Sequence, residues 1–409
     1  MNTVSVNPLP ASVRHEAMTP PVYSSHLDLL RGTAAIIVMC GHLRFHFEDL
    51  GRQPQQNILV DPQAKLAAAA HPFNYMNPAH QAVILFFVLS GALVGGSILR
   101  EYKRHRFSWV SYYTKRLSRL LTVLIPALVI GGFFDLVSRH ILASGQAAQF
   151  GALSDTEFNL GLKTFLGNLF FLQNLNRTGI PTFGSNAPLW SLSFEFWFYV
   201  LFPLLIAVIF TRLLRPRILF LLLFLITAVF VGEDVVFGLL LWSLGALVTL
   251  LPLAIPERAQ RFAVAVAFAL YGCAALFLWK HPFSNIVLDD YLLGLAVSIL
   301  VYVILHRREI HSRTVYVRVT ERIALMSFTV YLFHFPLVTM TVLFVARHYP
   351  SILRQQHRLA YFGIASLTYF ICYLFYLAFE RNTDRVRTLA TKLLARRPHT
   401  RTEPLISPR

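Results

Sequence analysis

The sequence predicts an all-α integral membrane protein with about ten transmembrane helices. Of its 409 residues, 56% are hydrophobic and 14% are charged, whereas a soluble domain carries about 25% charged residues. The apolar residues gather into ten segments close to the roughly 20-residue length that spans a bilayer. These segments lie near 27–47, 79–99, 119–137, 187–210, 217–232, 235–251, 262–279, 289–306, 322–346 and 359–379. We therefore expect the lipid bilayer to surround most of this chain.

The distribution of basic residues predicts that both termini are cytoplasmic. Cytoplasmic loops collect Lys and Arg. In this orientation the inner segments and the helix ends next to them hold 27 of the 37 Lys and Arg residues, and the outer ones hold 10. A further apolar segment, 161–175, is shorter, and a crossing there would move every later loop to the opposite side. We therefore interpret 161–175 as a re-entrant or surface segment on the outer side.

The chain divides into three predicted parts. Residues 1–26 are polar and rich in proline, without the apolar core of a cleavable signal peptide, so we expect a cytoplasmic segment there. Residues 27–380 form the transmembrane domain, and residues 381–409 form a basic cytoplasmic tail that is too short for a second domain. The net charge of +17 is accounted for by the loops. It therefore indicates membrane topology and not nucleic-acid binding.

The first helix carries ionisable residues at membrane depth. Eleven residues, about three turns, separate Arg31 from His42, so both lie on one face roughly 16 Å apart. Asp28 is three residues before Arg31 and can pair with it. Because charges inside a bilayer are costly, they usually serve a function. The alternative is that Arg31 snorkels to the inner interface and that His42 is a buried histidine with satisfied hydrogen bonds.

A carboxylate lies inside the fourth helix. Glu195 is flanked by Ser191 and Tyr199, four residues away on either side, on the same helix face. Counting 1.5 Å per residue puts His42 roughly 8 Å and Glu195 roughly 12 Å below the outer edge of the bilayer. His334, in the ninth helix, falls near the midplane by the same count. These residues predict a polar region within the outer half of the protein.

Basic residues lie at the inner start of the third helix. Arg116 and Arg119 are three residues apart and share a helix face, and Lys115 is next to them. The arginine fork suits phosphate groups. The alternative is that these residues only anchor the helix at the cytoplasmic interface.

The second helix contains small residues whose pattern predicts close packing. Ser90, Gly91, Gly95 and Gly96 lie within 81–96 and allow a neighbouring backbone to approach. We take close helix packing as a sufficient explanation of this pattern.

We expect no metal site. His42 and His46 have the i, i+4 spacing of metal ligands, but no third ligand is clearly positioned. Cys40, Cys273 and Cys372 all lie in apolar segments, which argues against both a cysteine-rich metal site and a disulfide framework.

Taken together, these segments resemble the acyltransferase-3 family of bacterial membrane O-acyltransferases. The matching pieces occur in family order and read LDLLRGTAAIIVMCGH (27–42), LFFVLSG (85–91), the Arg116–Arg119 pair, LWSLSFEFWFY (189–199) and YLFHFPL (331–337). Two positions depart from the family pattern. A second acidic residue often follows the position of Glu195, where this chain has Phe196. The glutamate near the end of the last helix is often followed by proline, whereas Glu380 is followed by Arg381.

The resemblance implies an inner-membrane enzyme that moves an acyl group, most often acetyl, from cytoplasmic acyl-CoA to a hydroxyl. The implied acceptor is an extracytoplasmic carbohydrate such as exopolysaccharide or O-antigen. His42 would be the general base, Arg31 would position the donor, and Glu195 would orient His42 or bind the sugar. The remaining implied contacts are Lys115, Arg116 and Arg119 with the CoA phosphates, and Asp28, Ser191, Tyr199 and His334 with the substrates.

Two other readings stay open at this point. A small-molecule O-acyltransferase, acting on a macrolide for example, would use the same residues. A transporter of a lipid-linked sugar would also bury charges along a pore, although inspection of the sequence finds no internal repeat of the kind many transporters have.

Overall fold

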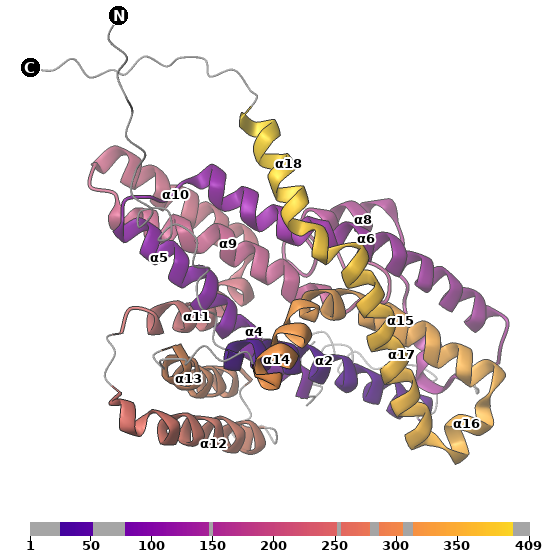
Figure 1. Cartoon of the computed structure of the whole chain (residues 1–409). Coiled ribbons are helices and arrows are strands. Elements are labelled where there is room, and N and C mark those ends of the chain that lie inside the picture. Colours follow the sequence, from indigo (N-terminus) through magenta and orange to yellow (C-terminus); the bar gives the residue numbers. More distant parts are fainter. Residues whose placement is uncertain are drawn as a thin grey trace, which may run out of the picture.

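All ten predicted membrane segments are helical in the computed structural model, which describes residues 25–51, 78–146, 150–251, 255–278, 286–305 and 314–395. The corresponding helices are α2 (Ser25–Gly51), α4 (Pro78–Ser90) continued by η1 (Gly91–Gly95) and α5 (Gly96–Lys103), α6 (Trp109–Ala143), α9 (Leu189–Phe210), α10 (Leu214–Val231), α11 (Glu233–Val248), α12 (Gln260–Leu278), α13 (Ile286–Leu305), α15 (Ser327–His348) and α17 (His357–Ala378). Figure 1 shows this all-helical arrangement. The prediction of an all-α membrane protein is confirmed.

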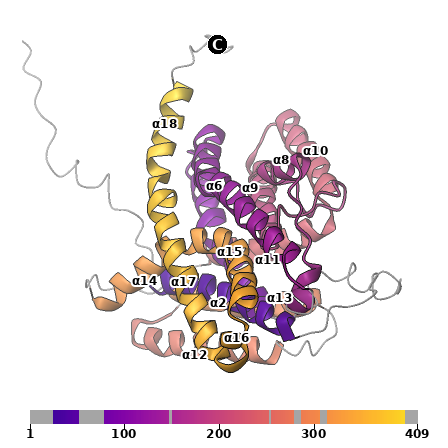
Figure 2. The same cartoon turned by 90° about the vertical axis from the view of Figure 1, so that its right-hand side faces the viewer.

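Eight of the described helices are long and apolar enough to cross a membrane alone. The other two predicted spans are α2, whose polar residues lower its hydropathy, and α11, which has 16 residues. Figures 1 and 2 place α2 inside the bundle, where it packs against α4, α14 (Val315–Leu325) and α15. His46 and Asp49 of α2 are buried against these helices, as polar groups within a membrane protein require, whereas Arg44 and Glu48 near its end are exposed.

The segment 161–175 does not cross the bilayer. It forms α8 (Leu162–Leu169), a helix of eight residues, followed by turns. Eight residues rise about 12 Å, less than half of the roughly 30 Å hydrocarbon core. The interpretation of 161–175 as a non-spanning segment agrees with this geometry.

Two helices begin differently from the prediction. The third membrane helix, α6, begins at Trp109, ten residues before the predicted start, because Ser108 caps it by accepting a hydrogen bond from the Ser111 amide. The predicted helix 322–346 is divided at Met326 into α14 and α15. The first turn of α15 is stabilised by a residue outside this helix, because the Glu380 carboxylate accepts a hydrogen bond from the Thr329 amide at 3.0 Å.

The small residues of the second helix pack closely against α11, as predicted. A Cβ added to Gly91 would overlap the carbonyl oxygen of Trp242, and one added to Gly245 would overlap the carbonyl oxygen of Val88. The chain passes through a π-helical turn at η1 in this region. Such turns are rare and often lie at functional sites, and this one begins directly after Ser90.

The remaining described elements are short helices at the ends of the bundle. They are η2 (Gly151–Asp155), η3 (Glu257–Ala259), α16 (Pro350–Gln355), η4 (Glu380–Asn382) and α18 (Thr383–Ala395). Residues 383–395 of the predicted tail are therefore helical, and α18 continues the direction of α17 and packs along α6 (Figure 2). The predicted segment 1–26 lies outside the described residues apart from its last two.

Candidate active site

Two histidines from distant parts of the sequence meet between α2 and α15. His42 Nδ1 lies 2.9 Å from His334 Nε2, within hydrogen-bond distance. The two rings are nearly parallel, at 14°, with centroids 5.1 Å apart. His334 is fully buried, whereas His42 is half-buried. The structure thus joins two residues that the sequence singled out separately.

A second contact between the same two helices lies one turn further along α2. His46 Nδ1 contacts the carbonyl oxygen of His42 at 2.8 Å, and His46 Nε2 contacts Thr339 Oγ1 at 2.8 Å. His46 is buried, and the aromatic ring of Phe335 lies edge-on to both His42 and His46. These contacts fix the register between α2 and α15 at the position of the histidine pair.

A carboxylate cluster forms where α4 meets α9. Glu195 Oε1 accepts hydrogen bonds from Ser90 Oγ at 2.8 Å and from Tyr199 OH at 2.5 Å, and the two hydroxyls are 3.3 Å apart. Both hydroxyl groups therefore donate to the same carboxylate oxygen. The other oxygen, Glu195 Oε2, accepts from no group in the part of the chain that the structure describes, and Glu195 is only half-buried. This oxygen is therefore available to a substrate.

Tyr331 connects the carboxylate cluster to the histidines. Its hydroxyl oxygen lies 2.5 Å from Ser191 Oγ. It also interacts electrostatically with the Glu195 carboxylate. The ring of Tyr331 lies 6.2 Å from that of His334, measured between centroids. Tyr331, Ser191 and His334 are all buried. The polar groups therefore continue from Glu195 to the histidine pair through the interior.

Arg116 extends the same polar region toward the end of the bundle that we expect to be cytoplasmic. Its guanidinium carbon lies 5.9 Å from the centre of the Tyr199 ring, in a cation–π arrangement. Its Nε is buried and has no hydrogen-bond partner among the described residues. Buried polar groups are normally hydrogen-bonded, so the unpaired Nε is an exception in this region.

A second group of charges lies beside Arg116. Arg119 stands over the Phe328 ring at 5.8 Å, and the Glu380 carboxylate interacts electrostatically with both Arg119 and Arg31. Glu380 also accepts from Thr329 Oγ1 at 2.6 Å. Arg31 pairs with Asp28 at 3.5 Å, as its spacing predicts. Three arginines from two helices therefore border one end of the site.

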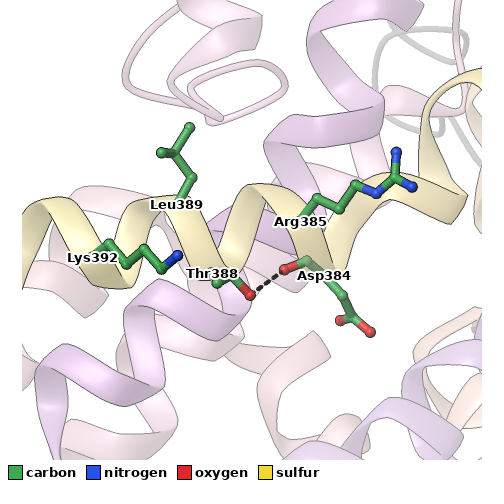
Figure 3. Close-up of a pocket in the computed structure, with 5 residues that line it drawn as sticks. All are labelled: Asp384, Arg385, Thr388, Leu389 and Lys392. Carbon is green, nitrogen blue, oxygen red and sulfur yellow. Dashed lines mark hydrogen bonds between the residues drawn. The ribbon is translucent and has the colours of Figure 1, made fainter.

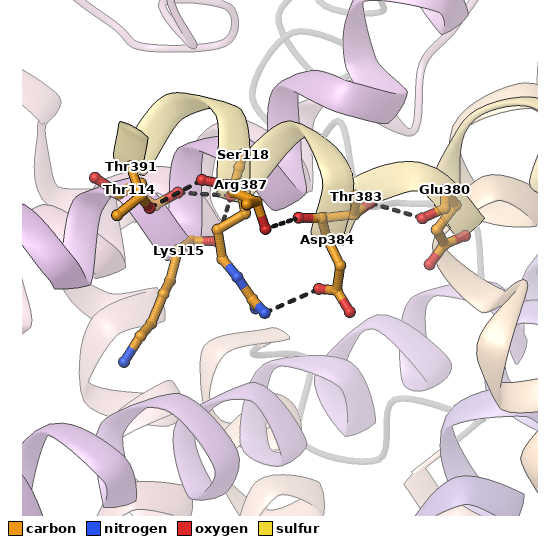
Figure 4. A network of polar contacts seen from close by, with 9 residues as sticks. Thr114, Lys115, Ser118, Glu380, Thr383, Asp384, Arg387 and Thr391 are labelled. Carbon is orange, nitrogen blue, oxygen red and sulfur yellow. Dashed lines mark hydrogen bonds and ion pairs between the residues drawn. The ribbon is translucent and has the colours of Figure 1, made fainter. Parts of the chain in front are cut away.

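Lys115 is exposed on α6, next to α18. Figure 4 shows Thr114, Lys115 and Ser118 of α6 beside α18, with the ammonium end of Lys115 pointing away from the Arg387–Asp384 pair, whose side chains are 3.1 Å apart. A shallow surface pocket of about 390 Å³ lies on α18 and includes Asp384 of this pair. It is lined by Asp384, Arg385, Thr388, Leu389 and Lys392 (Figure 3). This pocket contains none of the sequence-predicted site residues, and we give it no role.

The structure brings most of the predicted residues into one connected region, with Arg31, Arg116 and Arg119 at one end, Glu195, Ser191 and Tyr199 in the middle, and His42 and His334 beyond them. Lys115 is exposed on α6, and no described contact joins its side chain to this region. Sequence reasoning missed two members. Ser90 was interpreted as a packing residue, although it directly contacts Glu195. Tyr331 was not singled out, although it lies three residues before His334, on the same helix face. That spacing was the available signal for Tyr331.

The fold and these contacts define a multi-pass helical membrane protein whose interior polar region contains a histidine pair and a carboxylate. The sequence profile described as an acyltransferase domain, that of the acyltransferase-3 family, matches residues 25–377. The chain belongs to this family. An uncharacterised protein of Haemophilus influenzae is 27% identical over 143 residues, which are 33% of this chain and 53% of that protein. The match therefore covers about half of that relative. No solved structure matches the chain.

Proposed function

We propose that this acyltransferase moves an acyl group, most often acetyl, from cytoplasmic acyl-CoA to a hydroxyl of an extracytoplasmic carbohydrate such as exopolysaccharide or O-antigen. The proposal places it in a bacterial inner membrane. The observation that carries it is the connected polar region between three arginines at one end and the histidine pair at the other. Such an arrangement suits a donor and an acceptor that arrive from opposite sides.

His42 is proposed to act as the general base. It removes the proton of the acceptor hydroxyl, whose oxygen then forms a bond to the acyl carbonyl carbon while the bond from that carbon to the CoA sulfur breaks. The released thiolate takes up a proton, so the products are an ester and free CoA. Imidazole suits this step because it accepts protons near neutral pH.

The arginines are proposed to bind the donor. Lys115, Arg116 and Arg119 hold CoA phosphates, and Arg31 positions the thioester end of the donor. Two observations support this arrangement. Arg116 and Arg119 are three residues apart at the end of the polar region that we expect to be cytoplasmic, and guanidinium groups bind phosphate oxygens in pairs.

Replacing Arg116 and Arg119 together by Ala should raise the KM for acetyl-CoA. Hydrogen bonds to charged groups contribute about 1.5–3 kcal/mol each, which corresponds to about a 10- to 150-fold loss of affinity for each broken contact. The measurement is the initial rate of transfer against acetyl-CoA concentration in membrane vesicles. Arg217→Ala, which removes an exposed arginine from α10 at the same expected side, is the matched control. An unchanged KM in the double variant would contradict the proposed donor site.

Deleting the gene should remove O-acetyl signals from the NMR spectrum of the surface polysaccharide. Complementation with the wild-type chain should restore these signals because the proposed acceptor is a surface carbohydrate. Unchanged acetylation would refute the carbohydrate acceptor. The next assay would then supply small-molecule acceptors with acetyl-CoA and measure release of free CoA, a reaction that a transporter does not perform.

A further inference from the structure

Both ring nitrogens of His334 are already bonded within the protein. Nδ1 contacts the carbonyl oxygen of Val330 at 2.8 Å, and Nε2 contacts His42 Nδ1 at 2.9 Å. The side chain is fully buried. His334 was expected to bind substrate, but these contacts leave its ring no nitrogen for one. Its role must therefore be exerted through His42.

The Val330 carbonyl determines where the protons lie. A carbonyl oxygen can only accept, so His334 Nδ1 must carry a hydrogen. A neutral imidazole has one protonated nitrogen, which makes His334 Nε2 the acceptor. His42 Nδ1 must then be the donor in the contact between the two rings. The single hydrogen of neutral His42 lies on Nδ1, and Nε2 holds the free lone pair.

The opposite arrangement would require a charge. If His42 Nδ1 accepted the hydrogen bond, His334 would need hydrogens on both nitrogens and would be an imidazolium ion. His334 has no exposed surface and lies inside a membrane helix, where an isolated charge is strongly disfavoured. The neutral arrangement is therefore the stable one.

We propose that His334 is a positioning residue that holds His42 in the Nδ1–H tautomer, so that His42 Nε2 is the atom that takes the proton from the acceptor hydroxyl. Nε2 is bonded to no group in the described ranges, and it lies on the far side of the ring from Nδ1. This inference rests on the proposed function, because it assigns an atom to the general base.

The chain offers both a conservative variant and a matched control. In His334→Gln, the amide oxygen lies near the position of Nε2 and can accept from His42 Nδ1. In His334→Leu, no acceptor remains. Thr339→Val removes the hydroxyl that contacts His46, one turn along the same two helices, and leaves the histidine pair intact. The three variants separate loss of the acceptor from general loosening of the contact between α2 and α15.

The first test measures transfer of radiolabelled acetyl from acetyl-CoA to the endogenous glycan in membrane vesicles, at equal amounts of full-length protein. General-base catalysis contributes about 100- to 10,000-fold. We expect kcat to fall at least about 100-fold in His334→Leu with little change in the KM for acetyl-CoA. We expect His334→Gln to recover most of this loss and Thr339→Val to resemble the wild type. Equal activity of the Leu variant and the wild type, or equal inactivity of the Gln and Leu variants, would overturn the inference.

The second test does not depend on activity. Nitrogen-15 solid-state NMR of histidine-labelled protein in bilayers distinguishes Nδ1–H from Nε2–H, and the His42 signals are assigned by their loss in His42→Ala. We expect Nδ1–H in the wild type and in His334→Gln, and loss of this preference in His334→Leu. A wild-type His42 protonated on Nε2 would overturn the inference. Failure of transfer from acetyl-CoA together with the expected tautomer would instead refute the proposed function alone.

Discussion

Replacing His42 by Ala should lower the rate of acyl transfer by about 10²- to 10⁴-fold, the usual contribution of a general base. The half-buried imidazole keeps Nε2 open while Nδ1 is held by His334, so alanine removes the proposed proton acceptor altogether. The measurement is polysaccharide O-acetyl content by NMR in cells that lack the chromosomal copy and express the variant. The variant should still insert, because α2 is otherwise unchanged.

His357→Ala serves as the control for this substitution, since His357 is an exposed histidine at the start of α17. Its acetylation should equal that of the wild type. Near wild-type transfer by the His42 variant, at equal protein levels, would show that His42 is not the general base. Another group would then have to remove the proton of the acceptor hydroxyl.

Replacing Glu195 should have the second-largest effect, and two substitutions distinguish its possible roles. Glu195→Gln keeps an oxygen that accepts from Ser90 and Tyr199 but replaces the available Oε2 with an amide donor. Because a hydrogen bond to a charged group contributes about 1.5–3 kcal/mol, we expect kcat/KM to fall about 10- to 150-fold if Oε2 contacts a substrate. In Glu195→Ala, kcat/KM should fall further, because the hydroxyls of Ser90 and Tyr199 also lose their acceptor.

The measurement is the transfer rate from acetyl-CoA in membrane vesicles, with Glu233→Gln at the exposed start of α11 as the charge-matched control. Tyr199→Phe is a useful companion because it removes one donor to Oε1 and leaves Oε2 in place. Full activity of Glu195→Gln combined with inactivity of Glu195→Ala would show that Glu195 only organises its neighbours.

The fold was predictable because lipid imposes a simple rule. Spanning segments must satisfy their backbone hydrogen bonds internally, so long apolar runs become helices. All ten runs did so. The start of α6 and the break at Met326 were not predictable in this way, because they depend on a local cap at Ser108 and on Glu380 contacting Thr329 from another helix.

The candidate site was predictable only residue by residue. A charge or an imidazole in a membrane helix is conspicuous, and this identified Arg31, His42 and Glu195. Ser90 was not conspicuous, because a serine among glycines is equally well explained by close packing. The contact between His42 and His334 joins residues 292 positions apart, and no spacing rule within one helix can predict such a partner.

The first membrane helix, α2, carries residues of both ends of the polar region. Because this helix runs without a break from Ser25 to Gly51, Arg31 and His42 are two points on one rigid rod. A tilt of the rod about its middle moves these points in opposite directions. Under the proposed function, a tilt that displaced Arg31 from the donor would displace His42 from the acceptor in the opposite direction, so the positions at the two substrates would change together.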